Sequence, residues 1–402
     1  MFEIKGKVNT AICYAKVVED EAIAQIQRMC DFPMTEGSKI RIMPDVHSGK
    51  GCTIGTTMTI KDKAVPNVVG VDIGCGMYTA DIGKQKVDFN KLDAAAHFIP
   101  SGRNVWEGRS ERFDLEALRC YRNLQKTKWL ERSLGTLGGG NHFIEVDVAA
   151  DGNQYLVIHS GSRNLGKQVA EIYQKLAIDL DKIGDDYFET REEIIRTYKE
   201  QGRRKEIQAA LEQLKKERNI GEGTMPEDLC FLHGKYLEDY LHDVEICQAF
   251  ARRNRERMAE IIFEQTGLKS GDCFHTIHNY IDTKEMILRK GAIAAHKGEK
   301  VLIPINMKDG SVLAVGKGNP EWNFSAPHGA GRIMSRTKAK DTLSLEEYKK
   351  VMTGIFTTSV NEQTLDEAPM AYKSLDDIID VIKESVDVID IMKPIYNFKA
   401  SD

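Results

Sequence analysis

Hydrophobic and polar positions change their spacing along the chain, and the changes predict alternating strands and helices. Apolar residues recur every three or four positions over residues 19–29 and 236–263, which predicts amphipathic helices. Residues 155–158 form a continuous apolar run, as expected of a buried strand, and residues 385–399 alternate as a final strand would. Strands are therefore expected on both sides of a helical region.

The same patterns predict how the elements are organised. Residues 85–133 are expected to be mostly helical, residues 40–43 extended, and residues 286–316 to supply two or three strands. We expect an α/β (α+β) fold, with central mixed β-sheets surrounded by helices, in one domain spanning residues 1–402. A helical insertion is expected at about residues 166–268. Two later helices should begin with capping boxes, at Ser344 with Glu347 and at Ser374 with Asp377.

Residues 69–77 are predicted to be an apolar strand that ends in a glycine-rich turn carrying Asp72 and Cys75. Gly74 and Gly76 relax the backbone there, so that a carboxylate and a thiol three residues apart can face one point and bind a metal. The alternative is a buried strand followed by an ordinary turn, with Cys75 as a small core residue.

Four further segments place a candidate ligand or nucleophile beside a glycine or at the end of a predicted strand. A glycine-rich stretch at residues 134–146 contains Asn141, His142 and Glu145, and alternation sends Asn141 and Glu145 to one side of a strand. Residues 159–166 place a glycine-containing loop between a strand and a helix, which forms either an anion site that includes Arg163 or a simple connection. The remaining candidates are His159, His278 with Asn279, and His328 between Pro327 and Gly329.

These donors constrain the metal that they could bind. One carboxylate, one thiolate and several imidazoles suit a borderline divalent ion such as Mn²⁺ or Zn²⁺. Two ions that share Cys75 would use all of these groups. Paired metals are a recurring device in phosphoryl transfer, because they hold the attacking and leaving oxygens.

Composition narrows the class of protein. The chain has 402 residues, 41% of them hydrophobic, and a net charge of −5, as in a globular protein with a sizeable core. No apolar run is long enough to span a membrane, and the first residues lack a signal-peptide pattern, so a cytoplasmic location is expected. Eight cysteines without a Cys-x-x-Cys pair are expected to be mostly buried thiols.

A negative net charge disfavours general nucleic-acid binding, so any RNA partner would need a local basic patch. Basic residues crowd positions 103–132, where a solvated face is the simpler interpretation. His47 and Lys50, in a polar loop predicted at residues 44–51, are either phosphate contacts or part of an exposed turn.

Long motifs spread over nearly the whole chain resemble the RtcB-type RNA ligases, also called 3′-phosphate/5′-hydroxy RNA ligases, with this chain in a somewhat divergent branch. The resemblance implies a GTP- and Mn²⁺-dependent enzyme that joins RNA 3′-phosphate or 2′,3′-cyclic phosphate ends to 5′-hydroxyl ends. The reaction would pass through a covalent histidine–GMP intermediate, in RNA repair or tRNA splicing. No membrane partner is implied, and a monomer is expected. The motifs lie at residues 44–51, 69–77, 134–146, 159–166, 278–280 and 328–340.

The resemblance also implies roles for individual residues. His328 would be the nucleophile that becomes guanylylated, and Cys75 would bridge two Mn²⁺ ions. Asp72 and His142 would complete one metal site, and His159 and His278 the other. The implied GTP contacts are Asn141, Glu145, which would recognise guanine, His278, Asn279, Ser311, His328, Gly329, Ala330, Gly331 and Lys399, and the candidate RNA or phosphate contacts are His47, Lys50, Arg163, Arg332 and Arg336.

The chain departs from the family pattern near the implied guanylylation pocket, at residues 305–308, 325–327 and 396–400. The altered turn at residues 305–308 motivates an alternative hypothesis, a dimetal phosphodiesterase or phosphatase that trims RNA ends without joining them. A third hypothesis is an RNA-binding or sensor module with structural metals, although such a module has no need of a nucleophile at His328.

Overall fold

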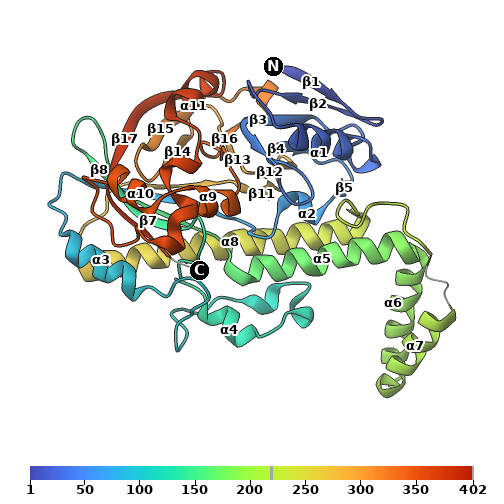
Figure 1. The fold of residues 1–402 in the computed structure, drawn as a ribbon. Helices are drawn as coiled ribbons and strands as arrows, with labels where there is room; N and C mark the ends of the chain where they lie inside the picture. The colour runs from blue at the N-terminus through green and yellow to red at the C-terminus, as the bar shows by residue number, and fades with distance from the viewer. Residues whose placement is uncertain (218–220, 401–402) are drawn as a thin grey trace.

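Two large β-sheets organise the chain, and the long helices α5 and α8 lie side by side below them in the view of Figure 1. The structure is a computed structural model that describes residues 1–217 and 221–400. Helices and strands are mixed along the described chain, which confirms the predicted α/β class.

The first sheet has six strands and contains one parallel pair, β2 with β3, among antiparallel neighbours. Its spatial order is β1 (Phe2–Lys5), β2 (Thr10–Cys13), β3 (Ile40–His47), β4 (Ile54–Thr59), β12 (Ile287–Lys290) and β11 (Asn279–Asp282).

The second sheet has seven strands, all paired antiparallel. The long strand β17 joins its two halves because it pairs with β7 on one side and β15 on the other. The predicted final strand at residues 385–399 is confirmed. The spatial order is β10 (Cys273–Ile277), β6 (Gly76–Gly83), β8 (Gln154–Ser160), β7 (Phe143–Val148), β17 (Val386–Lys399), β15 (Gly310–Gly316) and β14 (Lys300–Asn306).

Short strand pairs and helices complete the fold. The pairs are β13 (Ala292–Ala294) with β16 (Ser325–Pro327), and β5 (Lys63–Ala64) with β9 (Leu232–His233). The helices are α1 (Asp20–Cys30), α2 (Pro66–Val69), α3 (Phe89–Phe98), α4 (Thr127–Arg132), α5 (Arg163–Ile183), α6 (Asp185–Glu200), α7 (Ile207–Glu217), α8 (Gly234–Thr266), α9 (Arg336–Thr342), α10 (Leu345–Val351) and α11 (Leu375–Ile382).

Helix α8 forms a wall shared by the two main cores. Its residue Phe250 packs in the core that includes α1, α5 and the six-stranded sheet, whereas Met258 packs with Ile144 and Tyr396 under the seven-stranded sheet. The helix ends at Thr266, and Gly267 caps it with a left-handed φ of 78°, which other residues adopt at a cost. Because α8 touches both cores, its position fixes how they meet.

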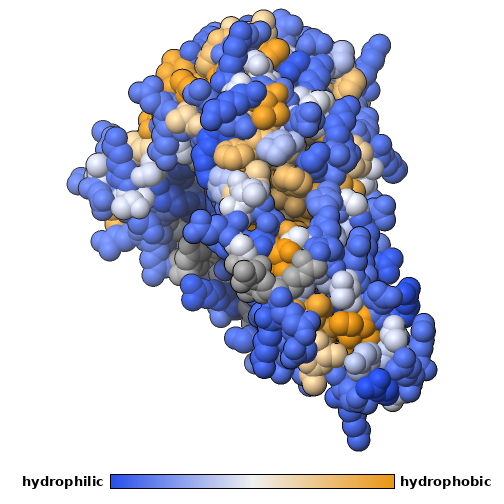
Figure 2. All heavy atoms as spheres, turned by 90° about the vertical axis from the view of Figure 1, so that its right-hand side faces the viewer, coloured by the Kyte–Doolittle hydropathy of each residue, from blue (hydrophilic) through white to orange (hydrophobic). Residues whose placement is uncertain are grey.

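Helices α6 and α7 project from the far end of α5 as a helical arm (Figure 1). Figure 2, which looks at the side carrying this arm, shows a mostly hydrophilic face with hydrophobic side chains near the top, in the middle and low on the molecule, over the arm. Within the described ranges, 1–217 and 221–400, no helix is long and apolar enough to cross a membrane.

The prediction of a strand over residues 69–77 is wrong. Val69 ends the short helix α2, and a turn containing Cys75 leads into strand β6 at Gly76. Pro66 starts the helix with a fixed φ, and Val68 and Val69 are fully buried. A short apolar run cannot distinguish a buried strand from a buried helical turn, so the pattern was ambiguous here.

Two other expectations also need correction. The predicted loop at residues 44–51 begins only at Ser48, because Pro44 to His47 belong to β3, where an irregular register with β4 accommodates the proline. Residues 85–133 are not mostly helical: between α3 and α4 the chain is irregular except for two short 3₁₀ turns. Pro100, Gly102 and Gly108 interrupt the apolar spacing there.

The two capping expectations have different outcomes. Ser374 and Asp377 form the reciprocal capping box at the start of α11. Ser344 accepts a hydrogen bond from the Glu347 amide, which is half of the predicted arrangement.

Asp243 on α8 generates a stability prediction. The carboxylate is fully buried and accepts hydrogen bonds from the amides of Arg119 and Cys120 and from the Tyr173 hydroxyl. We expect Asp243→Ala to lower the free energy of unfolding by about 2–4 kcal/mol, because three donors lose their buried acceptor. Urea denaturation measures the change. The exposed Glu238→Ala on the same helix is the control, and equal effects of the two substitutions would contradict this role.

Candidate active site

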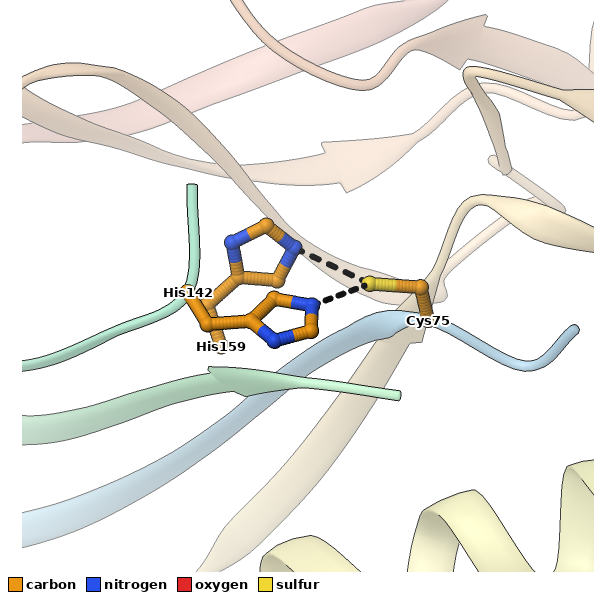
Figure 3. Close-up of side chains that lie close together, drawn as sticks. All are labelled: Cys75, His142 and His159. Carbon is orange, nitrogen blue, oxygen red and sulfur yellow. Dashed lines mark hydrogen bonds between the residues drawn. The ribbon is translucent and has the colours of Figure 1, made fainter. Parts of the chain in front are cut away.

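Cys75 lies at the centre of a buried cluster of potential metal ligands. Its sulfur is 3.4 Å from Nε2 of His142 and 3.3 Å from Nε2 of His159, and Figure 3 shows both imidazole rings pointing at the sulfur. All three side chains are buried, and their ligand atoms lie within 4.8 Å of one another. Three side chains distant in sequence thus converge on one point.

His278 and Asp72 extend this cluster on opposite sides. Nε2 of His278 is 3.1 Å from Nε2 of His159, and a carboxylate oxygen of Asp72 is 3.1 Å from Nε2 of His142. The cluster therefore consists of two pairs, one of Asp72 and His142 and one of His159 and His278, and Cys75 lies between the two pairs. We call these five residues the ligand cluster.

Glycine-rich turns allow the ligands to approach one another. Gly138 has a φ of 92°, and a Cβ at this position would collide with the His142 ring and the Arg163 guanidinium. A Cβ on Gly161 would collide with the Asp72 carboxylate. The turns expected from the sequence are needed because backbone and ligand side chains come too close for any larger residue.

Protonation in the cluster suits a metal. Nδ1 of His159 lies 3.0 Å from the Asn141 carbonyl, which fixes the proton on Nδ1 and leaves the Nε2 lone pair free. Burial lowers the pKa of His159 and His278 well below the usual value, so both rings are neutral at pH 7. Burial, together with Asp72, raises the pKa of the Cys75 thiol, so a metal that binds there must displace its proton.

The distances between the ligand atoms also fit those expected around a bound metal. Metal bonds of about 2.0 Å to nitrogen and 2.3 Å to sulfur place neighbouring ligand atoms roughly 3.1–3.6 Å apart. The sulfur–nitrogen distances of 3.3 and 3.4 Å lie within this range. Asp72 Oδ1 and His278 Nδ1 are buried without a protein partner in the described parts of the chain. Donor types and spacing together fit one or two borderline divalent ions.

A cavity of about 240 Å³ adjoins the ligand cluster. His159 lies in its wall, and the rings of His278 and His328 are 4.8 Å apart, which connects the cluster to the cavity. The predicted site residues in the cavity wall are His47, Asn141, Glu145, His159, His328, Gly329, Ala330, Gly331, Arg332, Arg336 and Lys399.

Apart from members of the ligand cluster, four predicted residues lie outside the cavity wall, namely Lys50, Arg163, Asn279 and Ser311. Ser311 is fully buried with no partner for its hydroxyl among the described residues, and Asn279 accepts a hydrogen bond from the Gly291 amide. Lys50 is exposed. Arg163 donates to Thr136 and to the Gly102 carbonyl, beside the ligand cluster.

His328 is held by a carboxylate that the sequence analysis passed over. Nδ1 of His328 is 2.6 Å from Oδ2 of Asp45, and the His328 amide donates to the same oxygen at 3.1 Å. Asp45 is fully buried. The carboxylate therefore accepts a hydrogen bond from Nδ1–H, which leaves Nε2 of His328 with a free lone pair.

Glu367 is a second residue that sequence analysis missed. It accepts hydrogen bonds from Lys399 at 2.7 Å and from the Tyr372 hydroxyl at 2.6 Å, and pairs with Arg336 at 3.0 Å and Arg332 at 3.3 Å. Although burial alone would raise it, the positive charges of Lys399 and Arg336 lower the pKa of Glu367 to about 2. One carboxylate thus positions three of the cations in the cavity wall.

Glu145 also has an unexpected partner. Asn397, directly across from it on β17, donates to a Glu145 oxygen at 2.5 Å. Burial and the neighbouring Asp147 raise the pKa of Glu145, and burial raises that of Asp147 to about 6. Glu145 in the cavity wall therefore lies close to a second carboxyl group, that of Asp147. Predicting Asn397 as its partner would have required knowing the register of β7 with β17.

Comparison with known proteins gives one consistent result. A sequence model of a family described as tRNA-splicing ligase RtcB matches residues 25–126 and 108–400. An RNA-splicing ligase RtcB1 of Escherichia coli is 31% identical, with 95% of each chain covered, and the RNA-splicing ligase RtcB of E. coli strain K12 is 30% identical with the same coverage. A tRNA-splicing ligase RtcB of Aeropyrum pernix is 26% identical over 92% of this chain and 90% of its own.

The lowered pKa of Glu367 gives a pH-dependent prediction. The folded-state value of about 2 lies below the unfolded value of about 4.3, so the ionised carboxylate stabilises the fold above pH 4.3 and this contribution is lost as the pH falls towards 2. We expect Glu367→Gln to reduce the free energy of unfolding on the order of 2–3 kcal/mol at pH 7. The difference in free energy of unfolding between Glu367→Gln and the unsubstituted protein should become smaller below pH 4.3.

Urea denaturation between pH 7 and pH 3.5 measures this gap. The control is Glu362→Gln, an exposed position at the start of the same 3₁₀ segment. A gap for Glu367→Gln that stays constant over this pH range would rule out the ionised carboxylate as its cause.

Proposed function

The chain belongs to the RtcB family and is an RNA ligase, and from this premise we propose that it uses GTP and Mn²⁺ to join RNA 3′-phosphate or 2′,3′-cyclic phosphate ends to 5′-hydroxyl ends. The observation that carries the proposal is His328, whose ring is held by the buried Asp45 at the wall of a cavity beside the ligand cluster. Such a histidine is oriented for attack on phosphorus.

In the first step, Nε2 of His328 attacks the α-phosphorus of GTP. A nitrogen–phosphorus bond forms, the bond from this phosphorus to the bridging oxygen breaks, and pyrophosphate leaves. Asp45 keeps its hydrogen bond from the Nδ1–H group and stabilises the positive charge that develops on the ring. The product is a histidine–GMP intermediate.

In the second step, an oxygen of the RNA 3′-phosphate attacks the same phosphorus and releases His328. The 5′-hydroxyl oxygen of the second RNA end then attacks the phosphorus of the 3′-phosphate and gives up its proton to solvent. The bond from that phosphorus to the GMP oxygen breaks, GMP leaves, and a phosphodiester remains. A cyclic phosphate must first be opened by water to a 3′-phosphate. Arg332 and Arg336 in the cavity wall are proposed to bind the phosphate groups, as is His47, which lines the same cavity.

The ligand cluster is proposed to hold two Mn²⁺ ions, with Asp72, Cys75 and His142 binding one and Cys75, His159 and His278 the other. Bound metal would supply Lewis-acid stabilisation of negative charge on the reacting phosphate. The neutral imidazoles and the unpartnered Asp72 oxygen support this assignment.

The nucleotide is proposed to lie in the cavity, with Glu145 contacting the guanine base and Asn141 and Lys399 contacting other parts of the nucleotide. The family resemblance implies Ser311 and Asn279 as further nucleotide contacts. Since neither lines the cavity, we propose that they support the residues that do.

The proposal predicts covalent labelling. GTP labelled at the α-phosphorus should, with Mn²⁺, label the protein through an acid-labile bond, and His328→Ala should abolish the label because the attacking nitrogen is lost. His97→Ala, an exposed histidine on α3, is the matched control and should label normally. Label that persists in His328→Ala would contradict the assignment of the nucleophile.

The same preparation can be tested for ligation. RNA fragments with 3′-phosphate and 5′-hydroxyl ends should be joined only when GTP is present, and a denaturing gel separates the product. Trimming of cyclic phosphate ends without GTP and without a joined product would instead identify a phosphodiesterase.

A further inference from the structure

Two adjacent polar residues on α8, Asn254 and Arg255, lie fully buried beside the ligand cluster. Arginine and asparagine are rarely fully buried, because each polar atom removed from water must find a partner. Burial lowers the pKa of Arg255 to about 10, so the guanidinium still carries its charge at pH 7. The hydrogen bonds of Asn254 and Arg255 identify the backbone segments that this buried pair connects.

Arg255 joins two of the segments that bear ligands. Its Nη1 donates to the carbonyl of Gly74 at 2.8 Å and to the carbonyl of Ser160 at 2.7 Å. Gly74 directly precedes Cys75, and Ser160 directly follows His159. One nitrogen atom therefore connects the backbone of the Cys75 turn to the end of β8.

Asn254 brings in the third segment. Its Oδ1 accepts from the amides of Gly135 and Thr136 at 2.7 and 3.0 Å, and these residues lead into the loop that carries His142. Its Nδ2 donates to the Ser160 hydroxyl and to the Gly161 carbonyl, both at 3.1 Å. The pair together contacts the backbone next to Cys75, next to His159 and at the base of the His142 loop.

The helix backbone is close enough to make this connection rigid. Gly74 has a φ of 77°, and a Cβ built there would lie 2.9 Å from the Cα of Gln248 and 3.0 Å from the Cβ of Ala251. The Cys75 turn therefore rests directly on α8, one to two helical turns before Arg255. A helix that packs in both cores cannot shift without disturbing them.

We propose that Asn254 and Arg255 are positioning residues that fix the spacing of Cys75, His142 and His159, so that the ligand cluster is preorganised for metal. This inference rests on the metal centre of the proposed function. Within the described parts of the chain, neither side chain hydrogen-bonds to a donor atom of the ligand cluster, and both act through the backbone beside it. Groups that orient ligands in this way typically change metal affinity by about 10–100-fold.

Cobalt binding tests the proposal, because Co²⁺ bound to thiolate absorbs in the near ultraviolet and its visible bands report ligand geometry. The full chain is titrated with Co²⁺ as the unsubstituted protein, Arg255→Met, Arg255→Lys and the control Arg252→Met, which lies on the exposed face of α8. We expect Arg255→Met to weaken Co²⁺ binding about 10–100-fold and to shift the bands at saturation. Arg255→Lys, which retains one cationic donor, should recover part of the Co²⁺ affinity and part of the band positions. Arg252→Met should match the unsubstituted protein in both affinity and spectrum.

The spectrum at saturation separates positioning from general stability. A substitution that only destabilises the fold lowers the unfolding temperature but leaves the spectrum of the folded, metal-loaded protein unchanged. Near-ultraviolet circular dichroism identifies folded protein, and if Arg255→Met does not fold, the spectrum of Arg255→Lys decides. Unchanged affinity and bands in the folded variant would overturn the proposal. Absence of the thiolate band in the unsubstituted protein would instead overturn the metal centre itself.

Discussion

The contact between one buried sulfur and two imidazole nitrogens is the constraint on which the site depends. Cys75, His142 and His159 come from a turn, a loop and a strand that are distant in sequence, yet their donor atoms lie 3.3 and 3.4 Å apart. Burying two imidazoles and a thiol side by side is unfavourable unless the surroundings hold them there or a cation joins them. Much of the nearby structure supplies such support: glycines where a side chain would collide, the Asn141 carbonyl on His159, and the buried polar pair on α8.

Carboxylates organise the cavity beside the cluster in a similar way. Asp45 fixes the orientation of His328 through its Nδ1, and Glu367 gathers Lys399, Arg332 and Arg336 into one wall. Each carboxylate is almost fully buried, so its charge is poorly screened and its partners are held firmly. The proposed reaction needs both effects, since the nucleophile must point at phosphorus while several cations stay available to a highly charged substrate.

The sequence predicted the components of this site better than their supports. The positions of His142, His159, His278 and His328, beside glycines or at strand ends, predicted them as site residues. The structure brings all four together. Their roles stay predictions. The roles of Asp45 and Asn397 arise only when segments more than two hundred residues apart meet, and that of Glu367 arises when the fold brings Lys399, Arg332 and Arg336 around it. The strand expected at residues 69–77 is wrong because the short apolar pattern fits a buried helical turn equally well: residues 66–69 form α2, and residues 70–75 form the turn that leads into β6. The helical insertion at about residues 166–268 stays a prediction.

We propose Cys75 as the shared corner of two metal sites. Anomalous diffraction from crystals grown with Mn²⁺ and GTP, measured on both sides of the manganese absorption edge, tests this proposal. We expect two anomalous peaks, both within roughly 2.3–2.6 Å of the Cys75 sulfur, one beside Asp72 and His142 and the other beside His159 and His278. A single peak, or two peaks of which only one contacts the sulfur, would contradict it.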